Sequence, residues 1–190
     1  RGPVLIDVPC DIQNAEIKKF SYPETVFMRT YKPTVKGNIV QIKKVVAELE
    51  KARRPLICAG GGVLLSGAET ELLAFAEKKQ IPVVSTMMGI GVMPTRHPLY
   101  FGMVGNNGKA YANRAMNESD LLLMVGARVA DRAVNQPDLI MNNKVLIHMD
   151  VDPAEIGKNV GPTIPLVGDA RHIFEDLLAQ EFSCKCEEWV

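Results

Sequence analysis

Residues 119–132, S-D-L-L-L-M-V-G-A-R-V-A-D-R, combine residue types that suit the binding of an anion. An apolar run, Leu121–Val125, ends at Gly126, and Arg128 and Arg132 follow within the next six residues. A glycine lets a ligand approach the backbone, and guanidinium groups donate paired hydrogen bonds that match phosphate oxygens. An ordinary strand end with surface arginines has the same pattern. The segment alone therefore leaves both interpretations open.

Three more predicted strands end in residues that suit ligand contacts. Residues 60–62, all glycine, follow Pro55–Ala59, residues 86–89 follow a second strand, and Asp150 ends a third. The carboxyl ends of parallel strands meet at one edge of a sheet, and ligands of open α/β sheets bind outside that edge. A helix N-terminus after the glycines would suit a phosphate, and the Asp150 carboxylate would accept hydrogen bonds from ribose or ribityl hydroxyls. For the glycine run alone, a tight strand-to-helix turn is the simpler explanation.

Helix and strand patterns alternate along the chain and would position these residues. Asn38 is suited to cap one helix, and Ser66 with Glu69 has the capping-box spacing of another. Glycine-rich residues 97–108 are expected to form mostly loop. The predicted helices span residues 38–53, 109–117 and 170–180, with one more opening at 66–69, and the predicted strands span 4–8, 55–59, 82–86, 121–125, 145–150 and 164–167.

This alternation with short connections dictates an α/β fold, a parallel sheet flanked by helices on both faces. We expect residues 1–36 to be the end of a preceding domain plus a linker. Residues 37–182 should form a central nucleotide-binding-type domain, and 183–190 should begin a following linker. The chain lacks a starting methionine, so we expect an excised piece of a longer polypeptide.

The composition excludes several classes of protein. The 22 basic and 22 acidic residues balance, which argues against nucleic acid or an anionic membrane as a partner. No uncharged apolar stretch reaches membrane-spanning length, and there is no signal peptide, so we expect a cytoplasmic protein. The 4 cysteines are too scattered for a disulfide framework, and Cys58 suits a core position.

Familiar catalytic arrangements are missing from the sequence. The dinucleotide motif G-x-G-x-x-G fails because Leu65 stands at its third glycine, which argues against a standard nicotinamide site. The C-x-C of Cys184 and Cys186 lacks two further ligands for zinc. We interpret His148 as a packed strand residue and Asp152 as a helix cap. The sequence thus predicts a binding domain with no catalytic and no metal-ligating residues.

Several motifs together resemble the central domain of thiamine-diphosphate-dependent acetohydroxyacid synthases, also called acetolactate synthases. They occur in the family's order over nearly the whole chain, and together they are specific although each alone is weak. The matching motifs are G-P-V-L-I-D-V-P (residues 2–9), R-T-Y-K-P-T (29–34), G-G-G-V (60–63), T-M-M-G-I-G-V-M-P (86–94), G-M-V-G (102–105), Y-A-N (111–113), G-A-R with D-R (126–132) and H-M-D-V-D-P-A-E-I-G-K-N (148–159).

The resemblance implies that this domain binds FAD, which has no redox part in the family's main reaction. By resemblance, the FAD contacts fall on Arg29, Gly60, Gly61, Thr86, Met87, Gly105, Gly126, Arg128, Arg132, Asp150, Val151, Asp169 and Ala170. The parent enzyme condenses pyruvate with pyruvate or 2-ketobutyrate and releases CO2 in branched-chain amino-acid biosynthesis. Thiamine diphosphate and magnesium belong to flanking catalytic domains of the same chain. A homo-oligomer of the parent and a regulatory subunit are further implied partners, and the fragment alone is expected to be inactive.

The chain departs from the family pattern at two places. Asn106 and Asn107 stand where the family has Met-His, and Ala130 stands where it has the first of two aspartates. The alternative is a nucleotide-free scaffold domain of another thiamine-diphosphate decarboxylase or carboligase. A third hypothesis, an NAD-binding deacetylase-like regulator, is disfavoured because the sequence offers neither a convincing catalytic histidine nor a zinc module.

Overall fold

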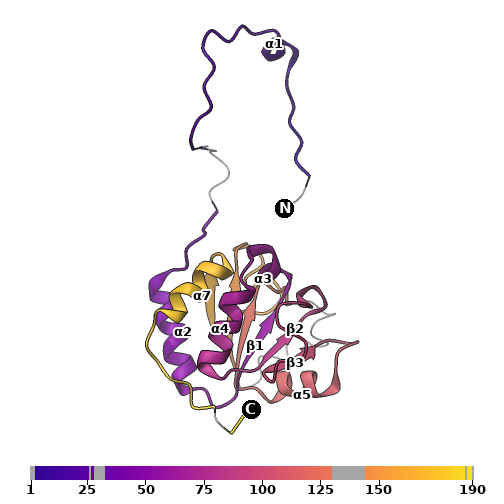
Figure 1. Ribbon diagram of the computed structural model, residues 1–190, viewed down its shortest axis with the longest axis vertical. Helices are drawn as coiled ribbons and strands as arrows, with labels where there is room; N and C mark the ends of the chain where they lie inside the picture. Colours follow the sequence, from indigo (N-terminus) through magenta and orange to yellow (C-terminus); the bar gives the residue numbers. More distant parts are fainter. Residues whose placement is uncertain (1–2, 26, 28–32, 130–143, 187, 190) are drawn as a thin grey trace. The chain divides into compact units, whose positions relative to one another are not determined.

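The computed structural model describes residues 3–25, 27, 33–129, 144–186, 188 and 189 (Figure 1). The chain divides into two compact units, Arg1–Lys32 and Pro33–Val190. In the described part of the first unit, the regular element is the short helix α1 (Cys10–Gln13). The predicted strand at residues 4–8 is wrong: Val4, Leu5 and Ile6 are exposed, and residues 4–8 form no ladder. An apolar run becomes a strand only where a neighbour accepts and donates its backbone hydrogen bonds.

The second unit is built on a six-stranded parallel sheet with the order β3-β2-β1-β4-β5-β6. This confirms the predicted α/β class with a parallel sheet. The strands are β1 (Pro55–Ala59), β2 (Val83–Ser85), β3 (Tyr100–Met103), β4 (Leu121–Val125), β5 (Val145–Asp150) and β6 (Ile164–Val167). The helices are α2 (Ile39–Lys51), α3 (Gly61–Ser66), α4 (Glu69–Lys79), α5 (Ala110–Glu118) and α7 (Ala170–Leu178), with a 3-10 turn η1 (Met87–Gly89).

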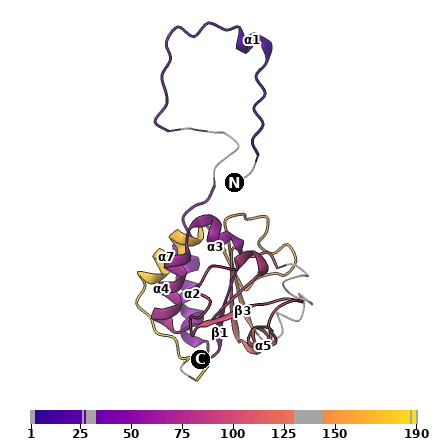
Figure 2. The same cartoon turned by 45° about the vertical axis from the view of Figure 1, so that its right-hand side comes forward.

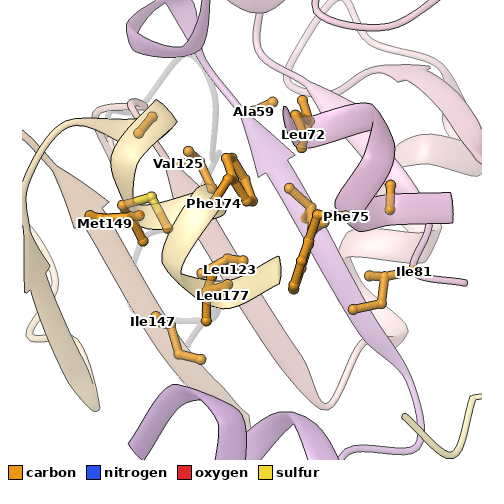
Figure 3. Close-up of a cluster of buried hydrophobic side chains, with 14 of the residues drawn as sticks. Ala59, Leu72, Phe75, Ile81, Leu123, Val125, Ile147, Met149, Phe174 and Leu177 are labelled. Atoms are coloured by element: carbon orange, nitrogen blue, oxygen red, sulfur yellow. The ribbon is translucent and has the colours of Figure 1, made fainter. Parts of the chain in front are cut away.

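Helices α2, α4 and α7 cover one face of the sheet, and α5 lies on the other (Figures 1 and 2). On the first face, Phe75 of α4 and Phe174 of α7 pack with ring centroids 5.5 Å apart (Figure 3). Each is fully buried, which stabilises the fold by about 2 kcal/mol per side chain relative to exposure. On the second face, α5 buries Ala112, Ala115 and Met116. The strands β1 and β4 are buried throughout, as the apolar runs predicted.

Residues 97–108 are mostly loop, as predicted, but they also contain strand β3, which was not predicted from the sequence. It is a half-buried edge strand, and its pairing with β2 carries a register shift. Gly102 within it has a φ of 85°, a conformation that favours glycine. The glycines therefore accommodate an irregular edge strand rather than breaking the sheet.

The predicted capping box at Ser66 and Glu69 is also wrong. Ser66 is the last residue of α3, and its hydroxyl donates to the carbonyl of Val63 at 3.0 Å. Gly67 ends that helix in the left-handed conformation, and α4 then begins after Ala68 without a side-chain cap. The Asn38 cap is confirmed, since its side chain accepts from the amide of Val40 at 2.9 Å. No helix within the described part of the chain could span a membrane.

Candidate functional site

Every predicted site residue in the described part of the chain lies at the carboxyl end of a strand. Because all six strands are parallel, these ends form one edge of the sheet, the carboxyl edge. Gly60 and Gly61 follow β1, Thr86 and Met87 follow β2, Gly105 follows β3, Gly126 and Arg128 follow β4, Asp150 ends β5 before Val151, and Asp169 and Ala170 follow β6. The predicted contacts Arg29 and Arg132 lie outside the described residues, as does Ala130.

The centre of this edge is the point where the strand order reverses. Strands β1 and β4 are neighbours in the sheet, while β2 and β3 lie on one side of them and β5 and β6 on the other. In open α/β sheets, the crevice outside this reversal is where ligands bind. Gly60 and Gly126 follow the two central strands and therefore border that crevice.

The glycine run packs backbone against backbone at the crevice. The amide of Gly60 donates to Val125 O at 2.8 Å, and the amide of Gly62 donates to Gly126 O at 2.9 Å. A Cβ on Gly60 would lie 2.3 Å from Gly126 O. The run thus begins the short helix α3 and holds it against the end of β4, as expected for a tight turn. Two of its amides are committed inside the protein, so the run is a poorer phosphate cradle than the sequence suggested.

Gly126, which follows β4, forms the other side of this close contact. Its φ is 53°, and a Cβ there would lie 2.6 Å from the Cα of Gly62. Its amide donates to Met149 O at 2.8 Å, which ties the end of β4 to β5. Glycine is needed at this position both for the backbone conformation and for the contact with α3.

The loop after Gly126 is held by side chains from the segment that ends β5 and follows it, residues 148–159. His148 Nε2 lies 3.1 Å from Ala127 O. The amide group of Asn159 donates to Val129 O at 2.5 Å. Arg128, between them, has its Nε 3.7 Å from Glu155 Oε2, and its side chain is 76% exposed. The guanidinium is therefore presented to solvent from an anchored loop.

His148 is buried in the sheet, which confirms the interpretation as a packed strand residue. Burial lowers its pKa, and the hydrogen bond to Ala127 O only partly opposes that effect. The neutral ring must donate from Nε2 to this carbonyl, since a carbonyl oxygen only accepts. Its Nδ1 is then a buried acceptor, and no described residue donates to it.

Asp150, Val151 and Met87 give the carboxyl edge mixed polarity. Asp150 is half-buried, and its Oδ1 accepts from the amide of Asp152 at 2.9 Å. Apolar side chains are exposed after two strands of this edge, Met87 after β2 at 67% and Val151 after β5 at 50%. Asp152 caps a turn rather than the expected helix: its Oδ1 accepts from the amide of Ala154 at 2.9 Å.

Three predicted positions, Gly105, Asp169 and Ala170, serve the fold directly. The side chain of Asn113, on α5, accepts from the amide of Gly105 at 2.8 Å and donates to its carbonyl at 2.9 Å. Both backbone groups of Gly105 are therefore used within the protein. Asp169 caps α7 by accepting from the amide of Arg171 at 3.0 Å, and Ala170 is buried in that first turn. The role of Asn113 depends on a contact between separate elements and left no local signal in the sequence.

A pocket of about 730 Å³ opens at the opposite edge of the sheet, where the strands begin. Its lining residues are Arg53, Arg54, Asp120, Lys185, Glu188 and Trp189. The Asp120 carboxylate accepts from the amides of Arg53 and Arg54 at 2.8 and 2.9 Å. The Arg54 guanidinium lies 5.9 Å from the centre of the Trp189 ring. This pocket includes none of the predicted site residues, and we place the candidate site at the carboxyl edge on chemistry and topology.

Comparison with known proteins adds independent findings. Residues 42–177 match the model of the family described as thiamine pyrophosphate enzyme, central domain. The chain is 47% identical over 180 residues to a probable acetolactate synthase large subunit of Methanocaldococcus jannaschii, covering 94% of this chain and 30% of that protein. It is 41% identical over 178 residues to the acetolactate synthase large subunit of Haemophilus influenzae, covering 93% of this chain and 31% of that protein.

The fold also occurs in a solved structure. A protein from Mycobacterium smegmatis, assigned as a thiamin diphosphate-dependent enzyme, superposes with a TM-score of 0.68 at 24% identity. The match covers 86% of this chain and 31% of that chain. The chain thus spans about a third of the length of the proteins that it matches.

Proposed function

The chain belongs to the central-domain family of thiamine pyrophosphate enzymes, and we propose that it is the FAD-binding central domain of an acetolactate synthase large subunit. The parent polypeptide would condense pyruvate with pyruvate or 2-ketobutyrate and release CO2. Thiamine diphosphate and magnesium would be held by flanking catalytic domains of the same polypeptide. The proposal extends to a homo-oligomer of the parent and to a regulatory subunit as its partners.

The observation that carries the proposal is the arrangement of residues at the carboxyl edge. An exposed arginine, Arg128, stands on an anchored loop beside the point where the strand order reverses. Six strands spaced about 4.8 Å apart give an edge of about 24 Å, long enough for an extended dinucleotide to lie along it. Gly60 and Gly126 hold the turns after β1 and β4 in close backbone contact at the centre of this edge.

The residues of the edge fit the separate parts of FAD. Arg128 would donate to the pyrophosphate, because its forked guanidinium matches phosphate oxygens. Asp150 would accept from hydroxyls of the ribose or ribityl chain, since its half-buried carboxylate lies at the end of β5. Met87 and Val151 would cover apolar surface of the ligand. Bound in this way, FAD would join the loops after β2, β4 and β5 as a structural ligand.

A nucleotide-free scaffold is the second candidate, and specific contacts favour it. The amides of Gly60 and Gly62 and both backbone groups of Gly105 are already hydrogen-bonded within the protein. Asp169 is likewise used as a helix cap. A ligand at this edge would therefore depend mainly on side chains and on few backbone donors.

Titration of the flavin-free complete polypeptide with FAD separates the two candidates. The proposal predicts saturable binding, recovery of flavin absorbance after dialysis, and a melting temperature that rises with FAD concentration, because a ligand selective for the folded state stabilises it. Adenosine, which lacks the flavin and the pyrophosphate, is the matched weak ligand. No binding and an unchanged melting temperature would instead support the scaffold.

Acetolactate formation is tested with the complete polypeptide and with the 190-residue chain alone. The complete polypeptide is expected to form acetolactate from pyruvate when thiamine diphosphate and Mg²⁺ are present, whereas the 190-residue chain alone is expected to form none. Acetolactate formation by the isolated chain would overturn the assignment of catalysis to flanking domains.

A further inference from the structure

Three successive residues after β4 are held from a single segment of the chain. His148 and Asn159 hold the carbonyls of Ala127 and Val129, and Glu155 faces the Arg128 guanidinium between them. The amide of Gly126 is also fixed, by Met149 O. The backbone on both sides of Arg128 is thus anchored by hydrogen bonds, whereas the Arg128 side chain makes a 3.7 Å contact with Glu155.

Glu155 is shared between two cations. Its Oε2 lies 3.7 Å from Arg128 Nε, and its Oε1 accepts from Lys158 Nζ at 3.1 Å. The Glu155 side chain is only 15% exposed, whereas those of Arg128 and Lys158 are 76% and 58% exposed. The carboxylate is therefore the fixed member of the group, and the two cations reach toward it from solvent.

We propose that Glu155 is the internal counter-ion of Arg128, and that an anionic ligand binds by replacing Glu155 as the partner of Arg128 while Lys158 keeps the Glu155 carboxylate paired in its place. This inference rests on the proposed function and adds a residue that governs ligand affinity. The ligand class is a nucleotide that brings pyrophosphate oxygens to Arg128. The exchange breaks the weak Arg128–Glu155 pair and forms a pair between Arg128 and phosphate.

The geometry makes this exchange easy. An exposed ion pair contributes at most about 1 kcal/mol, and its atoms here are farther apart than in a hydrogen bond. The contact between Lys158 and Glu155 survives the exchange, because it involves the other carboxylate oxygen. The anchored backbone then needs no rearrangement when the ligand binds.

The test measures Kd for FAD and for ADP with the complete polypeptide and its Glu155→Gln variant. Glutamine keeps the size of the side chain and removes the charge. We expect Glu155→Gln to tighten binding of both ligands by about two- to fivefold, the range given by an exposed ion pair. Adenosine, which has no phosphate, is expected to bind the two proteins equally.

A double-mutant cycle separates exchange from a general effect of charge. In the Arg128→Gln background, the Glu155→Gln change is expected to have no effect on Kd, because the pair is already broken. Lys158→Gln is expected to weaken binding, since Glu155 would then keep no ion-pair partner among the described residues once Arg128 turns to the ligand.

Two outcomes would overturn the inference. One is unchanged or weaker ADP and FAD binding by Glu155→Gln, and the other is a Glu155→Gln effect that persists in the Arg128→Gln background. Both require that the unaltered protein binds FAD. If it does not bind FAD, the proposed function fails instead, so the two failures are distinguishable.

Discussion

The two edges of the sheet are built by opposite means. At the carboxyl edge, the central contact depends on missing side chains, because Gly60 and Gly126 bring two backbones together. At the amino edge, the chain uses a side chain: the Asp120 carboxylate accepts from the amides of Arg53 and Arg54, across 67 and 66 residues of sequence. A pocket lined by Arg53, Arg54 and Trp189 lies at the amino edge, whereas the predicted ligand-binding residues gather at the carboxyl edge. The candidate site is therefore assigned by the position of its residues in the sheet and not by a cavity.

The largest effect is expected from a substitution at the carboxyl edge. Adding one carbon at the carboxyl edge, with Gly60→Ala, should lower the free energy of unfolding by about 3 kcal/mol, because the new Cβ meets Gly126 O at 2.3 Å and backbone cannot easily give way. Denaturant unfolding measures the change. Gly161→Ala is the matched control, since nothing lies within 4 Å of its Cβ. Equal stability of the two variants would remove the contrast between the edges.

At the amino edge, removing the Asp120 carboxylate, rather than adding a carbon, should lower the stability. Asp120→Ala is expected to lower the free energy of unfolding by about 2 kcal/mol, because two amides lose their acceptor at about 1 kcal/mol each. Asp120→Asn keeps one oxygen acceptor and should lose about half as much. Chemical denaturation of the three proteins side by side gives the comparison. A loss as large for asparagine as for alanine would mean that charge, rather than hydrogen bonding, stabilises this edge.

The smallest effect is expected from a substitution at Gly61, the neighbouring residue of the same glycine run. A Cβ on Gly61 would meet both Met88 Cβ and Met88 O at 3.2 Å, so the 3-10 turn η1, whose Met88 is 70% exposed, needs to shift by only a few tenths of an ångström. Gly61→Ala should therefore cost less than about 1 kcal/mol. Thermal unfolding of the Gly60→Ala and Gly61→Ala variants tests this. If Gly61→Ala proves the more destabilising, close backbone packing is not what requires glycine at residue 60.

The fold was largely predictable from the sequence, because buried strands of a parallel sheet consist of continuous apolar residues. Leu121–Val125 and Pro55–Ala59 appear as strands with the expected bounds. Strand β3 was missed because its half-buried residues surround Gly102, and edge strands lack a continuous apolar run. The capping-box prediction at Ser66 failed because the same spacing also occurs where one short helix ends and the next begins.

The site was predictable only to the level of the edge. Parallel strands place their carboxyl ends together whatever the details of packing, so Gly126 and Asp150 could be assigned to one edge. Several contacts that define the site join residues far apart in sequence, such as His148 with Ala127 and Glu155 with Arg128. Spacing along the chain does not encode such tertiary pairs. The positions Arg29 and Arg132 remain predictions that lie outside the described residues.

The central claim, that the ligand binds at the carboxyl edge and not in the pocket at the amino edge, is tested most directly by a matched pair of arginine variants. FAD affinity is measured by titration of the flavin-free complete polypeptide, unaltered or carrying Arg128→Gln or Arg54→Gln. The account predicts that Arg128→Gln weakens FAD binding by about tenfold or more, as expected for loss of a charge-assisted hydrogen bond, and that Arg54→Gln leaves Kd unchanged. Weaker binding in Arg54→Gln together with unchanged binding in Arg128→Gln would contradict it.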